Sequence, residues 1–161
     1  MLWWLVGGVI ISFGFVIAVG PPYLPTLDKQ VRTALKLLDL KPGQTLLELG
    51  CGDGRVLVAA ARQGLQVTGI ELNPLLAAFC WLRTVRYRKQ VRVVWGNYWA
   101  THHWPARTDG IFGFVLPKYM PKLDTLIIQS KRKGVKLASF AFVIPGKPIS
   151  RQQDGVFLYR Y

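Results

Sequence analysis

The spacing of apolar and polar positions separates the first twenty residues from the rest of the chain. Leu2 to Val19 is an apolar run that holds a single hydroxyl side chain and no charge. At about 1.5 Å per residue, a helix over this run measures about 27 Å, close to the hydrocarbon core of a bilayer. Trp3 and Trp4 stand at one end, and Gly20-Pro21-Pro22 ends the helix at the other. The pattern predicts one transmembrane helix over residues 1–20.

A cleaved signal peptide is the alternative interpretation of this run. It would need a basic start and a small-x-small cleavage site. No Lys or Arg precedes the run, and Ala18-Val19-Gly20 is followed by two prolines. We therefore expect an uncleaved anchor. The basic residues after it predict a single-pass protein whose remaining domain lies on the cytoplasmic side; they are Lys29, Arg32, Lys36 and Lys41.

The rest of the chain alternates between strand and helix patterns. Residues 21–44 form a linker and an amphipathic helix over 28–40, capped near Thr26 or Asp28. Residues 45–161 predict an α/β fold with a Rossmann-like parallel sheet and helices on both faces. The expected strands cover 45–49, 66–71, 91–95, 109–116, 135–143 and 156–161, and the expected helices cover 55–63, 74–86 and 120–133.

The composition excludes an intrinsically disordered chain and gives the protein a large positive net charge. Of the 161 residues, 51% are hydrophobic and 18% are charged, and the mean hydropathy is +0.25. The net charge of +13 lies entirely after residue 27, which predicts attraction to an anionic leaflet, an acidic protein or nucleic acid. Cys51 and Cys80 are too few for a disulfide framework or a metal quartet. The adjacent His102 and His103 are expected in a loop, so we predict no metal site.

The most informative segment is residues 46–62, LLELGCGDGRVLVAAAR. It predicts a strand, a turn containing Gly50, Gly52 and Gly54, and a helix. Such a turn lets a ligand approach the backbone closely and presents N–H groups at the start of a helix. A plain turn does not need three glycines in five residues, so the segment predicts a binding site.

Two ligand classes use this arrangement. The dinucleotide fingerprint G-x-G-x-x-G/A needs a small third residue, and Arg55 stands in that place. The pattern E-x-G-x-G-x-G instead resembles motif I of class I S-adenosylmethionine-dependent methyltransferases. That resemblance implies S-adenosyl-L-methionine as the cofactor, with Glu48 directed toward its methionine amino end. Glu71, at the end of the next strand, is expected to accept hydrogen bonds from the ribose hydroxyls.

Residues that follow the third expected strand are predicted to lie near the adenine of the cofactor. Asn97 stands where the methyltransferases often carry Asp, and its amide oxygen can still accept a hydrogen bond from the adenine amino group. The complete set of predicted cofactor-binding residues is Glu48, Gly50, Cys51, Gly52, Asp53, Gly54, Glu71, Leu72, Asn97 and Tyr98.

Further segments narrow the resemblance. An N-terminal membrane helix is followed by Tyr-Leu-Pro-Thr at 23–26, ELGCGDGR at 48–55, IELNP at 70–74, FVLP at 114–117 and FAFVIP at 140–145. In this order they resemble the small membrane-anchored protein-lysine methyltransferases. The eukaryotic members of that family modify the ATP synthase c subunit and the adenine nucleotide translocase. The resemblance implies a membrane-embedded or membrane-proximal protein substrate, and Tyr23, Pro25, Leu116 and Pro117 are the candidate acceptor-side residues.

Two alternatives remain. The charge of +13 favours a nucleic-acid methyltransferase, although Leu116-Pro117-Lys118-Tyr119 lacks the Asn/Asp-Pro-Pro-aromatic pattern of many base-methylating enzymes. The second alternative is a non-catalytic membrane module that keeps the cofactor-binding fold. The short tail after Pro145 also predicts that the antiparallel strand pair closing such sheets is trimmed.

Overall fold

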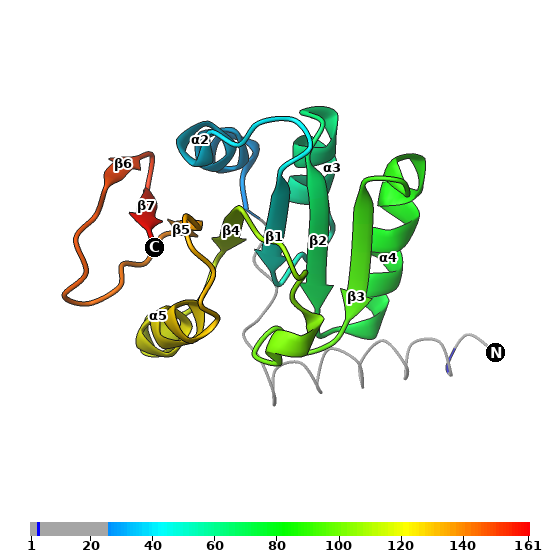
Figure 1. Cartoon of the computed structure of the whole chain (residues 1–161). Coiled ribbons are helices and arrows are strands. Elements are labelled where there is room, and N and C mark those ends of the chain that lie inside the picture. Colours follow the sequence, from blue (N-terminus) through cyan, green and yellow to red (C-terminus); the bar gives the residue numbers. More distant parts are fainter. Residues whose placement is uncertain (1–2, 4–25) are drawn as a thin grey trace.

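A computed structural model describes Trp3 and residues 26–161, which form one seven-stranded sheet flanked by helices (Figure 1). The strand order is β3-β2-β1-β4-β5-β7-β6. All neighbouring pairs are parallel up to β5, and β7 is antiparallel to both β5 and β6. The strands are β1 Thr45–Leu49, β2 Gln66–Glu71, β3 Val91–Trp95, β4 Gly110–Gly113, β5 Lys136–Phe140, β6 Arg151–Gln153 and β7 Val156–Arg160.

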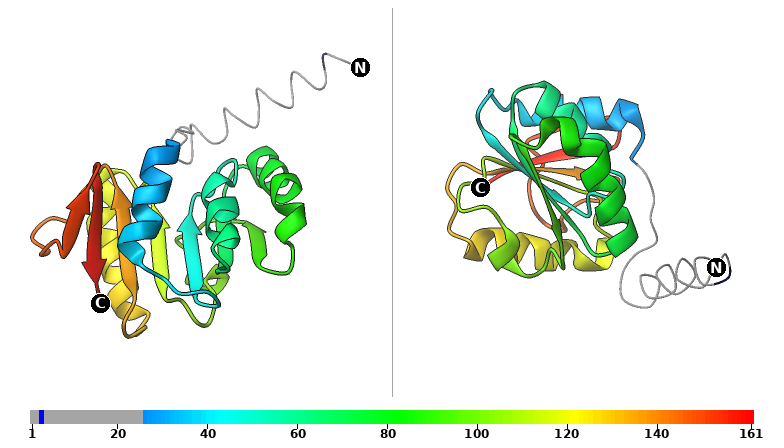
Figure 2. Two further views of the ribbon diagram at one scale, coloured as in Figure 1. Left: turned by 90° about the horizontal axis from the view of Figure 1, so that it is seen from above. Right: turned by 90° about the vertical axis from the view of Figure 1, so that its right-hand side faces the viewer.

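Helices cover both faces of this sheet (Figure 2). The helices α2, α3 and α4 lie on one face, and α5 lies on the other. Their bounds are α2 Asp28–Leu38, α3 Arg55–Arg62, α4 Pro74–Thr84 and α5 Met120–Gln129, and short 3-10 turns are η1 Val85–Tyr87, η2 Thr101–His103 and η3 Pro117–Tyr119. The predicted α/β sheet with helices on both faces is confirmed.

The two faces of the sheet make two cores. On one face, α2 and α3 pack over β1, β2 and β4, and Val31, Leu46, Leu57 and Phe112 are in contact there. On the other face, buried side chains of α5 pack against alternate residues of the same strands. Because β1 is buried on both faces, its sequence is an almost continuous apolar run. Glu48 is the exception and lies on the α2–α3 face, since it shares its side of the strand with Leu46.

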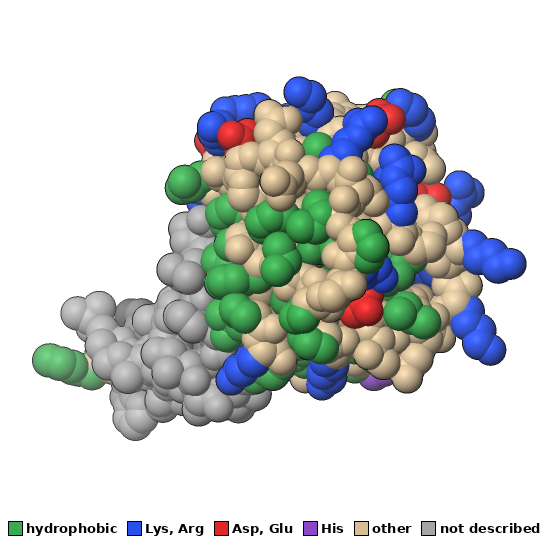
Figure 3. All heavy atoms as spheres, turned by 90° about the vertical axis from the view of Figure 1, so that its left-hand side faces the viewer, with side chains coloured by type: hydrophobic (Ala, Val, Ile, Leu, Met, Phe, Trp, Pro, Cys, Tyr) green, Lys and Arg blue, Asp and Glu red, His purple; other side chains and the backbone are tan. Residues whose placement is uncertain are grey.

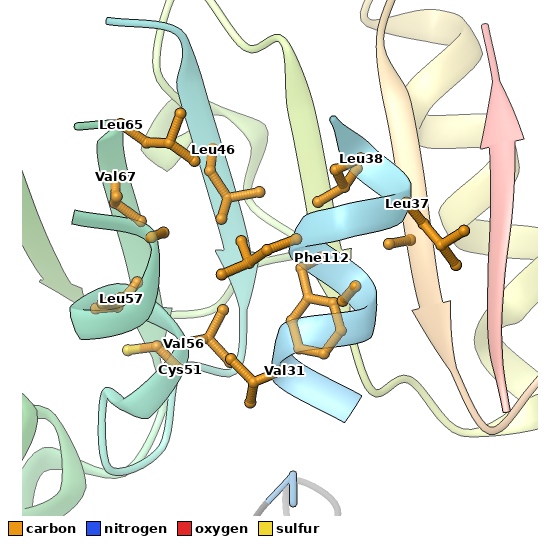
Figure 4. Packing of buried hydrophobic residues seen from close by; sticks show 14 of the residues in the cluster. Val31, Leu37, Leu38, Leu46, Cys51, Val56, Leu57, Leu65, Val67 and Phe112 are labelled. Atoms are coloured by element: carbon orange, nitrogen blue, oxygen red, sulfur yellow. The ribbon is translucent and has the colours of Figure 1, made fainter. Parts of the chain in front are cut away.

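The end of the sheet at β6 carries hydrophobic side chains on its surface, with Lys and Arg around them (Figure 3). Exposed apolar residues near this end include Val143 and Ile149 in the loop from β5 to β6. Away from the surface, α2 lies across the sheet, with Val31 and Phe112 pointing toward one another (Figure 4). This helix therefore belongs to the core of the described fold.

Several predicted strands differ in their ends. The strands at 66–71 and 91–95 are confirmed at both ends. The strand predicted over 109–116 is wrong at its carboxyl end, because β4 loses its partners after Gly113 pairs with Leu49 and Ser139. β5 ends at Phe140, since Ala141 takes a positive φ of 68° and leaves the extended conformation. β6 was not predicted, and the antiparallel pair is present with a strand of only three residues.

The helix ends show similar differences. Leu27, and not Thr26 or Asp28, is the N-cap of α2, and it makes no side-chain capping bond. α4 ends in the 3-10 turn η1 rather than continuing to residue 86. α5 ends at Gln129 instead of residue 133, because Lys131 adopts a left-handed φ of 52°.

The predicted membrane anchor lies outside the described residues, apart from Trp3, and so do Tyr23 and Pro25. Among the helices of the described part of the chain, none combines the length and hydrophobicity needed to cross a bilayer.

Candidate cofactor site

The predicted site residues meet at the carboxyl edge of the sheet, where the order of strands reverses. The chain runs outward from β1 to β2 and β3, then returns to place β4 on the other side of β1. The crevice outside the carboxyl ends at such a reversal is where α/β sheets bind ligands. Glu48 lies in β1 and Glu71 ends the neighbouring β2. The sheet topology therefore brings both predicted carboxylates to one edge.

The glycine turn after β1 is bound to the end of β2. The backbone N–H groups of Gly50 and Cys51 donate to the carbonyl of Ile70 at 2.9 and 3.1 Å. Gly52 donates its N–H to Oε2 of Glu71 at 2.9 Å. Gly50, Gly52 and Gly54 have φ values of 79°, 50° and 76°, which side-chain-bearing residues rarely adopt. The three glycines are thus needed for the path of this turn.

Glu71 is held by two backbone donors. Besides the bond from Gly52, its Oε1 accepts from the N–H of Asn73 at 2.8 Å. Asn73 in turn caps α4 by accepting from the N–H of Leu75 at 2.9 Å. Each carboxylate oxygen has a second acceptor position. Glu71 is therefore oriented by the protein and can still accept hydrogen bonds from a pair of neighbouring hydroxyls.

Glu48 is a buried carboxyl group whose hydrogen bonding is incomplete. Its relative exposure is 4%, and its Oε2 has no hydrogen-bond partner among the described residues. Burial raises the pKa of Glu48 well above its usual value, and the nearby Cys80, Asp53 and Glu71 add to that rise. A buried acceptor without a partner is costly for the fold and demands a donor. The ammonium group of an amino-acid moiety would supply both the donor and the opposite charge.

The space around the turn is asymmetric. A Cβ added to Gly54 would lie 2.6 Å from Sγ of Cys80, so this side of the turn is packed against α4. No atom of the described residues lies within 4 Å of a Cβ added to Gly50, and Gly50 itself is exposed. These features fit an amino-acid–nucleoside cofactor such as S-adenosyl-L-methionine. Gly50 leaves one side of the turn open, Glu48 has a buried oxygen without a partner among the described residues, and Glu71 is oriented to accept hydroxyl groups.

Asp53 and Arg55 form an ion pair at the end of the turn. Asp53 Oδ2 accepts from Arg55 at 2.9 Å and from Arg83 at 2.6 Å. Burial would raise the pKa of Asp53, but the hydrogen bonds and charges of Arg55 and Arg83 hold it below its usual value. Arg55 also donates to the carbonyl of Thr26 at 2.9 Å. The large side chain that excludes the dinucleotide fingerprint therefore links the turn to the start of α2.

The loop after β3 places aromatic residues beside the site. Asn97 is exposed, and its Oδ1 accepts from the N–H of Trp99 at 3.0 Å. Burial raises the pKa of Tyr98 to about 12, with Tyr119 and Glu71 contributing, so its hydroxyl stays protonated at neutral pH. The rings of Tyr98 and Trp99 are 4.7 Å apart, and Trp99 is 5.6 Å from Tyr119. This contact joins the loops after β3 and β4.

Three further predicted residues lie in the loops after β2 and β4. The carbonyl of Leu72 accepts from the indole N–H of Trp95 at 3.1 Å. Leu116 is half-buried, and its carbonyl accepts from the N–H of Tyr119 at 2.9 Å. Pro117 is exposed at the start of η3.

Three phenylalanines at the carboxyl ends of β4 and β5 were missed as site candidates. The ring of Phe114 lies 5.0 Å from that of Phe140 and stacks on Phe142 at 5.8 Å. All three are half-buried. The sequence signal was present, because Phe114 comes directly after the apolar run of β4, and Phe140 ends that of β5. These rings lie at the same edge of the sheet as the glycine turn, because β4 and β5 run parallel to β1.

Comparison with known proteins agrees with this geometry. Residues 48–151 match the ANTKMT methyltransferase domain. The chain belongs to this methyltransferase family. It is 41% identical over 127 residues to the adenine nucleotide translocase lysine N-methyltransferase of Mus musculus, covering 77% of this chain and 54% of that protein. It is 31% identical over 126 residues to the Xenopus laevis lysine N-methyltransferase named for the ATP synthase c subunit, with the same two shares.

The chain thus spans about half the length of these relatives. Among solved structures, an RNA methyltransferase from Salinibacter ruber in complex with S-adenosyl-L-homocysteine superposes with a TM-score of 0.75. The two are 23% identical, and the match covers 86% of this chain and 92% of that one. This likeness confirms the class I methyltransferase fold.

Proposed function

We propose that the protein is an S-adenosyl-L-methionine-dependent protein-lysine N-methyltransferase. The observation that carries the proposal is the buried Glu48, whose Oε2 has no hydrogen-bond partner among the described residues. Glu48 lies in the strand that leads into the glycine turn, and the neighbouring Glu71 is oriented by that turn. The lysine acceptor is supported by the names of the relatives in the same family. We also propose that residues 1–20 anchor the chain in a membrane, with the domain on the cytoplasmic side and a substrate protein in or near that membrane.

The residues have separate roles in this proposal. Glu48 holds the ammonium group of the cofactor, Glu71 binds the ribose hydroxyls, and Asn97 and Tyr98 border the adenine. When bound, the cofactor supplies an already activated methyl group, so the protein needs mainly to align the acceptor. No strong general base is required if the apolar surroundings keep the lysine amine neutral. Leu116, Pro117 and Phe114 supply such surroundings, and we assign Tyr23 and Pro25 to the same side.

Transfer of labelled methyl groups into a membrane fraction tests the proposal. Membranes from cells that lack the gene are incubated with the enzyme and methyl-labelled S-adenosyl-L-methionine, and the label is then traced in protein, RNA and lipid. We expect label on lysine side chains of a membrane protein, located by mass spectrometry. A Glu71→Ala variant, which loses the ribose acceptor, serves as the matched negative control.

The nucleic-acid alternative is supported by the net charge of +13. Label found only in RNA, with every lysine unchanged, would establish that alternative and overturn the lysine assignment. Absence of label from all fractions, together with cofactor binding by calorimetry, would favour a non-catalytic module.

A further inference from the structure

The helix α4 is apolar on the side that faces away from the sheet. Ala77, Cys80 and Thr84 are its buried residues and face the sheet. On the opposite side, Leu75, Phe79 and Leu82 are spaced as one helical stripe and are 44%, 53% and 61% exposed. A helix that is apolar all round is normally covered on all sides. The outward side of α4 is therefore a surface that lacks its cover in the described fold.

Neighbouring residues widen this surface. Trp81 and Val85, four residues apart, are 59% and 46% exposed. Trp95 is 68% exposed at the end of β3, the edge strand beside α4, and its indole N–H is bound to the carbonyl of Leu72. We name these six residues the α4 face: Leu75, Phe79, Trp81, Leu82, Val85 and Trp95. An exposed apolar group of this kind marks an interaction site more often than plain surface.

The chain around the α4 face is purely basic. No Asp or Glu occurs between Leu72 and Thr108. Arg86, Arg88, Lys89 and Arg92 follow the last turn of α4, and all four are exposed. Arg83, by contrast, is bound to Asp53. The apolar face is thus bordered at one end by a cluster of cations that no acidic side chain of the same segment balances.

We propose that the α4 face docks on an anionic lipid surface. Its apolar side chains would enter the boundary between headgroups and acyl chains, where indole rings such as those of Trp81 and Trp95 are favoured. The cations at its end would contact the lipid phosphates. A second copy of this chain is a poor occupant, because two such clusters on molecules of charge +13 repel one another.

Docking through the α4 face would do more than tether the domain to the bilayer, because it would also orient the cofactor site. α4 begins directly after Asn73, which is bound to Glu71, so the first residue of the α4 face lies next to the site edge. A flexible tether would leave every rotation of the domain accessible. Docking through α4 would instead hold the carboxyl edge of the sheet at a fixed orientation to the bilayer. The α4 face consists of described residues only, and its docking requires neither the proposed anchor nor methyl transfer.

Site-directed spin labelling of the full chain tests the inference without relying on activity. The label is attached at Phe79→Cys, and the native Cys51 and Cys80 are 3% and 0% exposed, so the introduced thiol reacts selectively. Gln129→Cys, exposed at the end of α5 on the opposite face of the sheet, is the matched control. Accessibility to a water-soluble nickel complex and to oxygen is measured with phosphatidylcholine vesicles that contain or lack phosphatidylglycerol.

We expect the label at position 79 to lose contact with the nickel complex and gain contact with oxygen when anionic vesicles are present. The label at position 129 should remain accessible to water, even if another segment tethers the chain to the same vesicles. The triple variant Arg86→Glu, Arg88→Glu, Lys89→Glu should lower the docking equilibrium roughly a hundredfold. Circular dichroism and binding of S-adenosyl-L-homocysteine verify that this variant is folded.

Three results would overturn the inference. Equal accessibility of position 79 with and without vesicles would mean that the face does not meet lipid. Protection of position 79 before vesicles are added would mean that protein covers it. Protection that is the same in purely neutral vesicles, or in the triple variant, would exclude the proposed role of the cations.

Discussion

At the scale of single residues, the site depends on two carboxylates in contrasting environments. Glu71 accepts two backbone N–H groups and is ready to bind hydroxyls. Glu48 is buried with an oxygen that has no partner in the described structure. One carboxylate is therefore satisfied by the protein, whereas the other destabilises the ligand-free fold until a cation reaches it. The contrast makes Glu48 the sharper probe of the cofactor assignment.

Replacing Glu48 by Gln should change how the stability of the ligand-free protein depends on pH. The folded-state pKa of Glu48 is raised, so its contribution to stability is fully present below the unfolded pKa of about 4.3 and falls as pH rises through the folded pKa. Glutamine does not titrate. The free energy of unfolding of the wild type should therefore fall relative to Glu48→Gln as pH rises, measured by urea unfolding across this range. Parallel curves would contradict the raised pKa.

The same variant should bind cofactor less well. Loss of the charged partner of the ammonium group is expected to weaken binding of S-adenosyl-L-homocysteine at least about tenfold at neutral pH, measured by calorimetry. Asp39→Asn, at an exposed carboxyl group, is the control and should bind with wild-type affinity. If Glu48→Gln binds S-adenosyl-L-homocysteine with wild-type affinity, the ammonium group of the cofactor does not bind at this position.

A pair of glycine variants should separate binding from stability. Gly50 and Gly134 both have positive φ, and at either position an added Cβ meets no atom of residues 26–161 within 4 Å. Gly50→Ala and Gly134→Ala should thus lose similar stability, about 1 kcal/mol, by urea unfolding. Only Gly50→Ala should also lose cofactor affinity, since its methyl group would enter the open side of the turn. Equal affinities in the two variants would place the ligand elsewhere.

At the scale of elements, the last strand is as important to the core as the parallel strands. β7 pairs with β5 and β6, and its Tyr159 is fully buried. The hydroxyl of Tyr159 accepts from the backbone N–H of Ile144 at 3.0 Å. This bond ties the chain that follows β5 to the last strand of the sheet. β7 and β6 therefore add two antiparallel strands to the sheet beyond β5.

Removing that hydroxyl should destabilise the fold through β7. Tyr159→Phe leaves the buried N–H of Ile144 without a partner, which costs about 1–3 kcal/mol. We expect a lower midpoint of urea unfolding at an unchanged slope. Phe157→Leu, a half-buried residue of the same strand, controls for general loss of packing in β7. If Tyr159→Phe loses less free energy of unfolding than Phe157→Leu, a water molecule replaces the hydroxyl as the partner of the Ile144 N–H.

At the scale of the whole molecule, every predicted cofactor-binding residue lies in the described part of the chain. The sheet, the glycine turn and the contact from Arg55 to the carbonyl of Thr26 all lie within residues 26–161. Deletion of residues 1–20 should leave the affinity for S-adenosyl-L-homocysteine unchanged by calorimetry. Methylation of a membrane substrate should fall, because tethering raises the effective concentration of the enzyme. Failure of the truncated chain to fold would instead make the deleted residues part of the core.

The pH dependence of turnover should report the acceptor. A lysine amine attacks only when neutral, and its usual pKa is about 10.4. With saturating cofactor, turnover should therefore rise from pH 7 to the alkaline range until the bound amine is deprotonated. Tyr98, with its pKa raised to about 12, does not titrate in this range. A flat profile, with cofactor binding verified at each pH, would argue against a lysine acceptor.

The sequence by itself determined the local elements and the chemistry of the turn. Strands 66–71 and 91–95, the glycine turn and the excluding role of Arg55 follow from residue type and spacing, because apolar periodicity and positive φ are local properties. The family could also be predicted from the sequence, since its motifs are short and follow one another in a fixed order along the chain.

Only the tertiary structure decided which elements are neighbours. The end of β4 at Gly113 and the bond from Arg83 to Asp53 depend on partners distant in sequence. The same holds for the buried oxygen of Glu48, which has no hydrogen-bond partner in the described part of the chain, and for the exposure of the α4 face. Hydrogen bonding and burial are properties of the packed sheet. Periodicity shows that a side of an element is apolar, but the fold alone determines whether anything in the chain covers it.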